Sequence, residues 1–151
     1  MTIYEKLLDL LPVIYPKFYT AFDEAKNELV FLDTGTGKSI NFKIFSDKTQ
    51  CEAFVNHFHI FDKIGKGNYD NVVAFGKEIS KNLLASLMKS FPNKEFLVYL
   101  QVSKDSTIVR FHQIWENEVP YFDVDIDDKN TEMFEFKTTM RSSNSHIWNT
   151  L

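Results

Sequence analysis

The most regular hydrophobic pattern in this chain lies between residues 72 and 91. Apolar residues recur there every three or four positions, namely Val72, Phe75, Ile79, Leu83, Leu87 and Phe91. This period matches one face of an α-helix, so the pattern predicts a single long amphipathic helix. Pro92 and Asn93 follow and are predicted to end it.

The pattern changes to strict alternation after this helix. Residues 95–103 and 107–115 are predicted strands, and Lys104-Asp-Ser106 between them predicts a tight turn. The second strand is apolar on both faces apart from three positions, which are Arg110, His112 and Gln113. A strand of this kind is usually central, with layers on both sides. Residues 121–127 and 132–138 predict two further strands.

The N-terminal half predicts two more helices. Thr2 and Glu5 have the spacing of a capping box and precede a leucine-rich segment, which predicts a first helix. An apolar stripe at residues 18–25 is predicted to continue it in helical form after Pro16. Thr49 and Glu52 form a second possible capping box, and the helix that it begins would carry apolar residues as far as Phe61.

Turn chemistry separates these two helical regions. Residues 29–33 and 39–45 are short strand candidates, and the glycine-containing segment between them predicts a hairpin turn. The whole chain, residues 1–151, therefore predicts one α+β domain. Its expected architecture is an antiparallel sheet of about five to six strands, with helices packed mainly on one face.

Composition says more about the cellular compartment of the protein than about its function. The 151 residues include a single cysteine, Cys51, so an internal disulfide is excluded and a reducing compartment is favoured. No N-terminal leader pattern and no apolar stretch of membrane-spanning length occur in the sequence. We therefore expect a cytoplasmic protein that does not enter a membrane.

The net charge of −4 is unevenly distributed. Residues 116–135 contain eight acidic residues and one lysine, a local charge of −7, whereas the rest of the chain carries +3. This asymmetry argues against nucleic acid as a partner of the acidic part and favours a basic protein. A solvated acidic edge that prevents aggregation is the competing interpretation.

The acidic segment supplies the candidate partner-binding residues. Carboxylates two positions apart on a strand would form a row at intervals of roughly 6.6–6.8 Å, with an aromatic anchor beside them. The predicted set consists of Glu116, Glu118, Tyr121, Asp123, Asp125, Asp127 and Asp128. The spacing of Asp123, Asp125 and Asp127 does not continue as a calcium-binding loop, because residue 128 is not glycine and residue 134 is not glutamate.

A small enzyme is the first alternative. Arg110 and His112 share one strand face, and with Glu116 or Asp123 they could form a general acid–base cluster. A structural ion pair on a half-covered sheet face is the more common explanation for such a pair. A second alternative is a non-enzymatic adaptor with a large exposed aromatic surface, since the chain has 15 phenylalanines.

Other chemistry-bearing residues do not complete a known site. Residues 35–39 end like a phosphate-binding loop, but the first glycine of that motif is replaced by Leu32 and no helix is predicted to follow. His57 and His59 could point together only from a strand, because helical geometry would separate them by about 200°. We expect both to be ordinary surface or interface histidines. Cys51 lies among apolar residues and is expected to be buried and inert. We expect no catalytic residues, metal or cofactor.

One segment carries a family resemblance. It contains a strand that ends in Val109-Arg-Phe-His-Gln113, a turn, and the sequence Glu118-Val-Pro-Tyr-Phe-Asp123. This part of the chain, residues 93–123, resembles small immunity proteins of bacterial contact-dependent growth inhibition and related polymorphic toxin systems. The resemblance implies a cytosolic, non-enzymatic protein that binds and neutralises one cognate toxin domain, often a nuclease. It transfers no binding residues, and neither the toxin's identity nor the oligomeric state follows from the sequence.

Overall fold

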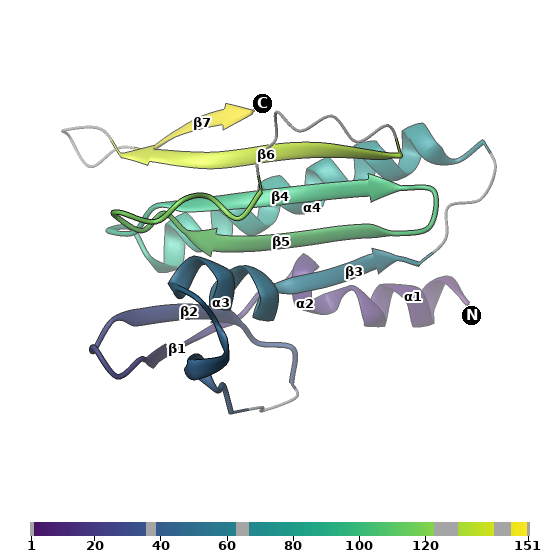
Figure 1. Ribbon diagram of the computed structural model, residues 1–151. Coiled ribbons are helices and arrows are strands. Elements are labelled where there is room, and N and C mark those ends of the chain that lie inside the picture. The colour runs from purple at the N-terminus through teal and green to yellow at the C-terminus, as the bar shows by residue number, and fades with distance from the viewer. Residues whose placement is uncertain (1, 36–38, 63–66, 123–129, 141–145, 151) are drawn as a thin grey trace.

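The computed structural model describes residues 2–35, 39–62, 67–122, 130–140 and 146–150. Its centre is a five-stranded antiparallel sheet with the order β3-β5-β4-β6-β7 (Figure 1). These strands are β3 (His57–Phe61), β4 (Phe96–Ser103), β5 (Thr107–Gln113), β6 (Thr131–Met140) and β7 (His146–Thr150). The predicted α+β class with a mainly antiparallel sheet is confirmed.

The long helix α4 (Tyr69–Ser90) covers one face of this sheet (Figure 1). Its apolar stripe packs on inward-facing residues of the central strands, including Val98, Leu100 and Phe111, in one continuous core. Gly76 lets the helix approach closely, because a Cβ atom there would lie 2.8 Å from a methyl carbon of Leu100. The helix predicted from the period of 3.6 residues is therefore confirmed, and packing of its apolar face explains its position.

The N-terminal segment folds differently from its predicted form after the first helix. Helix α1 (Ile3–Asp9) has the predicted capping box at Thr2 and Glu5, and α2 (Leu11–Ile14) follows directly. The helical stripe predicted at residues 18–25 is wrong, because β1 (Phe18–Phe22) pairs with β2 (Glu28–Leu32).

A local turn explains that error. The Asp23 carboxylate accepts hydrogen bonds from the backbone and side chain of Asn27, and Lys26 adopts a positive φ of 65°. This turn reverses the chain between the two strands, so β1 is the partner of β2. Residues 39–45 were predicted to pair as a strand with residues 29–33, but they contain the 3-10 helix η1 (Phe42–Ile44) instead. Residues 36–38 lie outside the described part of the chain.

Helix α3 (Lys48–Val55) is shorter than predicted. Its N-cap is Asp47, whose side chain accepts from the backbone N–H of Gln50, and not the predicted Thr49. The helix ends because the Asn56 side chain binds the backbone of β2, accepting from Leu32 N–H and donating to Val30 C=O. The residues that follow then pair with β5 as strand β3, so helical continuation to Phe61 is wrong.

The C-terminal strands largely agree with the predicted pattern. Strands β4, β5 and β6 occupy the predicted segments, and β5 is an interior strand because β3 and β4 pair with it on either side. Tyr121 and Phe122 belong to no strand, which removes the start of the strand predicted at 121–127. The rest of that segment, residues 123–127, is outside the described residues. No helix in the described ranges is both long and apolar enough to span a bilayer.

Candidate functional site

The face of the sheet opposite α4 carries a row of polar residues across four strands, which we call the polar row. Backbone pairing aligns His57 of β3 with Arg110 of β5, Arg110 with Tyr99 of β4, and Tyr99 with Glu135 of β6. Directly paired residues in adjacent strands point to the same face of a sheet. The register therefore brings together side chains that are up to 78 positions apart in the sequence, and only the tertiary structure shows this.

Arg110 is the centre of an aromatic clamp. Its guanidinium donates a hydrogen bond to the Ala53 carbonyl at 3.1 Å and lies 4.9 Å from the ring of Tyr121 and 5.2 Å from that of Phe122. Burial lowers the pKa of Arg110 from its ordinary value, but a guanidinium remains charged throughout the physiological range. Cation–π contacts of this kind are worth about 0.5–2 kcal/mol each, so they fix the segment that follows β5.

His112 holds the same segment from inside the protein. It is 1% exposed; its Nδ1 lies 2.6 Å from the Gln113 carbonyl, and its Nε2 accepts from the backbone N–H of Tyr121. The Tyr99 hydroxyl lies 3.1 Å from the same Nε2. Burial lowers the pKa of His112, so the ring is neutral at pH 7. Both ring nitrogens are occupied by internal partners, which makes His112 a structural residue in this geometry.

These contacts fix the chain at the point where it enters the acidic segment. Phe122 packs edge-on against Tyr99, with ring centroids 5.2 Å apart and an interplanar angle of 90°. Residues 123–129 lie outside the described part, and the chain is described again from Asn130, beside the first residue of β6. Thr131 pairs with Ser103 at the end of β4. The described residues on either side of 123–129 are therefore attached to the same sheet.

The predicted partner-binding residues have different surroundings. Glu116 is exposed. Glu118 faces inward, where it accepts from the backbone and hydroxyl of Thr49 and forms an ion pair with Lys48 at 2.7 Å. Tyr121 is half-buried in the clamp. The four remaining predicted residues, Asp123, Asp125, Asp127 and Asp128, are outside the described residues.

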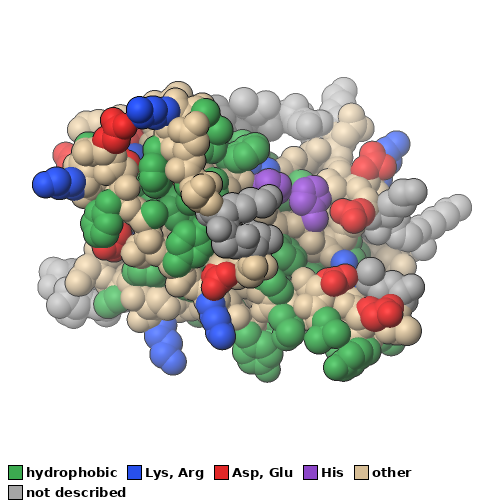
Figure 2. Space-filling model, turned by 90° about the horizontal axis from the view of Figure 1, so that it is seen from below, with side chains coloured by type: hydrophobic (Ala, Val, Ile, Leu, Met, Phe, Trp, Pro, Cys, Tyr) green, Lys and Arg blue, Asp and Glu red, His purple; other side chains and the backbone are tan. Residues whose placement is uncertain are grey.

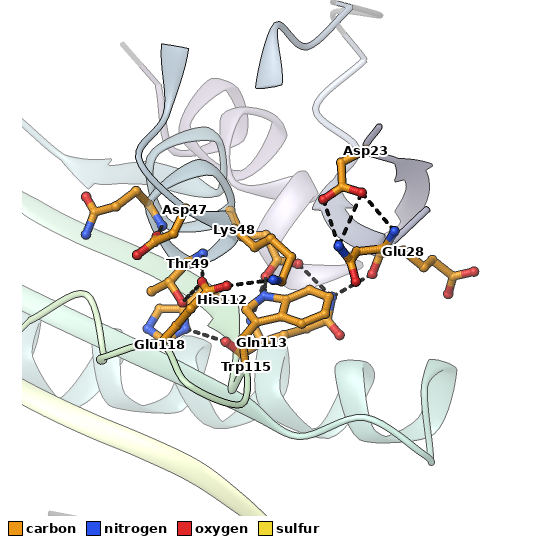
Figure 3. Close-up of polar contacts among 12 residues, drawn as sticks. Asp23, Glu28, Asp47, Lys48, Thr49, His112, Gln113, Trp115 and Glu118 are labelled. Carbon is orange, nitrogen blue, oxygen red and sulfur yellow. Dashed lines mark hydrogen bonds and ion pairs between the residues drawn. The ribbon is translucent and has the colours of Figure 1, made fainter. Parts of the chain in front are cut away.

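Next to Glu118 lies a polar network that the sequence did not reveal (Figure 3). Its centre is Glu52 of α3, which is fully buried and whose carboxylate accepts four hydrogen bonds. The donors are the backbone N–H groups of Val30 and Gln113, the Gln113 side-chain amide and the Trp115 indole N–H. This carboxylate joins α3, β2 and the end of β5. An acidic residue between the apolar residues Cys51 and Ala53 was the available signal.

A groove lies beside this network, between the β1–β2 hairpin and α3. It has a volume of about 670 Å³, and Tyr19, Asp33, Phe45, Phe54 and His57 are among the residues that line it. Cys51 is buried close by, and burial raises its pKa to about 12, so the predicted inert thiol agrees with its surroundings. Apolar side chains dominate the groove, and its rim carries a carboxylate and an imidazole.

Comparison with known proteins places the chain in a family. The model of the family described as "Uncharacterized protein PM0498 family" matches residues 16–145, which includes the polar row and the Glu52 network. No curated protein and no solved structure gave a significant match.

Proposed function

We propose that this chain, which belongs to the uncharacterized protein PM0498 family, is a cytoplasmic binding protein of the immunity type. In this proposal it neutralises a cognate toxin domain through residues 123–129, the aspartate-rich part of the acidic segment that follows Phe122. The partner is a basic protein, such as a nuclease whose own cationic surface binds nucleic acid. The proposal combines the family resemblance of residues 93–123, the aromatic clamp and the local charge of −7 over residues 116–135, of which −3 falls on residues 123–129.

The aromatic clamp is the observation that carries this proposal. Arg110 and His112 hold Tyr121 and Phe122 by their rings and backbone, so the acidic segment starts from a fixed point. Seven residues, 123–129, lie between Phe122 and Asn130, so the eight Cα–Cα steps from Phe122 to Asn130 span at most about 26–29 Å. Because the described residues on both sides are held on the sheet, less chain has to be ordered when a partner binds, which reduces the entropic cost.

Charge would act mainly on the rate of encounter. A concentrated negative surface attracts a basic partner over distances of about one Debye length, roughly 8–10 Å at physiological salt. Such steering can raise association rates by about 10- to 1,000-fold and fades as salt is added. The uncharged anchor contacts, in contrast, would govern dissociation.

The enzyme alternative receives less support from the same residues. For His112 to act as a general acid or base, one of its ring nitrogens must lie within reach of substrate, and both nitrogens are occupied inside the protein. The adaptor alternative has one observation in its favour. Helix α1 has no buried residue, and Ile3, Tyr4 and Leu7 on it are about half exposed or more. Replacing Leu7 with Glu would abolish partner binding if the adaptor alternative were correct.

The test is co-expression with the C-terminal domain of any large secreted toxin whose gene adjoins the gene of this chain. Rescue of growth and a stable complex are expected. Replacing Asp123, Asp125 and Asp127 together with Asn should lower the association rate at low salt by about tenfold or more. A matched control, Asp9→Asn with Glu24→Gln and Glu78→Gln, changes the net charge equally at exposed positions elsewhere. Equal effects of the two triple variants, or no rescue by the wild-type chain, would refute the proposal.

A further inference from the structure

Two histidines stand side by side on the edge strand β3. His57 and His59 are two positions apart and therefore project from the same face, and their ring centroids are 5.5 Å apart. Figure 2 shows histidine side chains together at the surface of the molecule. His57 is partly exposed, whereas His112 is buried. His59 is 48% exposed. Neither side chain is used by the proposed partner-binding segment.

Each ring has its Nδ1 directed at an oxygen acceptor. His57 Nδ1 lies 2.5 Å from the Phe54 carbonyl oxygen, which can only accept, so this nitrogen carries the proton. His59 Nδ1 lies 3.6 Å from a carboxylate oxygen of Asp62, a distance within the range of an ion pair but too long for a hydrogen bond. Metal-binding histidines in proteins show the arrangement of His57, in which one ring nitrogen donates to a carbonyl or carboxylate and the other binds the metal. The Nε2 atom of His57 is thereby left as the basic nitrogen of its ring.

The separation of the rings fits a shared ion. A metal held at about 2.0–2.1 Å from each Nε2 lies about 3.2 Å from each ring centroid, and tetrahedral geometry then places the centroids about 5.2 Å apart. The observed 5.5 Å differs from this by a few tenths of an ångström. Backbone pairing of β3 with β5 holds the two Cα atoms in place.

We propose that His57 and His59 form a two-imidazole chelate for a divalent transition metal ion of borderline softness, namely Zn²⁺, Ni²⁺ or Cu²⁺. Asp62 and the Phe54 carbonyl act as positioning groups. No cluster of three or more His, Cys, Asp or Glu suited to a metal occurs within the described ranges, so water completes the coordination. Imidazole nitrogen selects these ions over Mg²⁺ and Ca²⁺, which require oxygen ligands.

The surroundings moderate the affinity of this site. Arg110 is the backbone partner of His57 on the same face and contributes a positive charge that opposes a cation. Its guanidinium, however, is turned toward the Ala53 carbonyl and the two clamp rings. The carboxylate of Asp62 lies on the other side, next to His59. The positive charge of Arg110 and the negative charge of Asp62 partly cancel. The expected affinity for a metal ion is therefore that of two solvent-accessible imidazoles.

The experiment is a calorimetric titration of the full chain with ZnCl₂ and, separately, with NiCl₂. One saturable ion per chain is expected. Replacing both His57 and His59 with Ala should remove this binding, and either single replacement should weaken it by at least about tenfold, because a monodentate imidazole remains. Asp62→Asn should weaken binding by up to about tenfold through loss of ring orientation. The matched control is His146→Ala on β7, the strand at the opposite edge of the sheet.

A second measurement requires no variant. Paramagnetic Cu²⁺ added to the wild-type chain should broaden the amide signals of residues on β3 before those on β7. Broadening centred on β7, or binding that survives the His57 and His59 double replacement, would overturn the proposal. Failure of the wild-type chain to bind any of the three ions at millimolar concentration would also overturn it. The proposal is independent of toxin binding, because all of these measurements use the chain alone.

Discussion

Replacing Glu52 with Gln tests whether the buried carboxylate holds the fold together by accepting hydrogen bonds. In the native protein each of its oxygens accepts two of them. Oε2 accepts from the Val30 backbone and the Gln113 side chain, and Oε1 accepts from the Gln113 backbone and Trp115. All four partners are donors. Glutamine replaces one oxygen with an NH₂ group, which cannot accept from any of them.

The expected cost follows from that count. Two of the four N–H groups lose their acceptor, whichever way the amide is oriented. A buried donor left without a partner costs about 1–3 kcal/mol, so the replacement should destabilise the protein by about 2–6 kcal/mol. That is a large part of the total stability of roughly 5–15 kcal/mol that is typical of a domain. Burial raises the pKa of Glu52, and the four donors oppose that shift by favouring the ionised form.

Urea unfolding at pH 7, followed by Trp fluorescence and circular dichroism, measures this cost. The free energy of unfolding of the Gln variant should fall by the stated amount with an unchanged urea dependence. Glu24→Gln is the matched control, because the Glu24 side chain is 80% exposed and its replacement should change stability by less than about 0.5 kcal/mol. If Glu52→Gln also stayed within 0.5 kcal/mol of wild type, the network would not be a structural link and our hydrogen-bond reasoning would be wrong.

Three further predictions use the same unfolding assay or a simple chemical probe. Burial alone would raise the pKa of Glu118, but hydrogen bonds from Lys48 and Thr49 outweigh it and lower the pKa below its usual 4.5. The free energy of unfolding should therefore fall as pH drops below about 4.5. Glu118→Gln should make that fall less steep and should cost about 1 kcal/mol of stability at pH 7. Gly76→Ala should destabilise the protein by about 1 kcal/mol, because crowding against the core between α4 and β4 exceeds the gain in helix propensity; a more stable variant would contradict this. Cys51 should resist a thiol reagent at pH 8 in the native protein and react after unfolding, because burial raises its pKa to about 12; rapid native-state labelling would contradict its burial.

Periodicity along the sequence was sufficient where a segment is long and its pattern is unambiguous. The helix at residues 69–90 and the strands at 96–103, 107–113 and 131–140 agree with their predicted periods. Short aromatic segments were not decided by pattern, because Phe18, Tyr19 and Phe22 fit a helical stripe and a strand equally well. The deciding information was the Asp23–Asn27 turn, which positions β1 against β2.

The candidate site was predicted less completely than the fold, because its contacts are distant in sequence. Arg110 and His112 were identified from the sequence, but their roles depend on Tyr121 and Tyr99. Glu118 was grouped with the acidic residues, although α3 turns it inward through Thr49. Sequence spacing cannot show which carboxylates a neighbouring helix will bind. Register and tertiary packing supply that information.

Arg110 connects the two proposals, and its replacement should affect them in opposite directions. Arg110→Met keeps an apolar side chain beneath the clamp rings but removes the guanidinium that contacts Tyr121 and Phe122. It also removes a positive charge, so simple electrostatics would make the chain a better ligand for a basic partner. If the clamp instead matters because it fixes the start of the acidic segment, partner binding should weaken despite the more negative net charge.

Metal binding should respond to the same variant with the opposite sign. The lost positive charge lies one strand away from His57, so affinity for Zn²⁺ should rise by about three- to tenfold at low salt. Calorimetry with ZnCl₂ and association kinetics with the toxin domain, performed on one preparation, separate the two effects. Weaker toxin binding with stronger metal binding would support positioning by the clamp. A parallel rise in both affinities would show that Arg110 acts only through its charge, and the role assigned to the clamp would have to be abandoned.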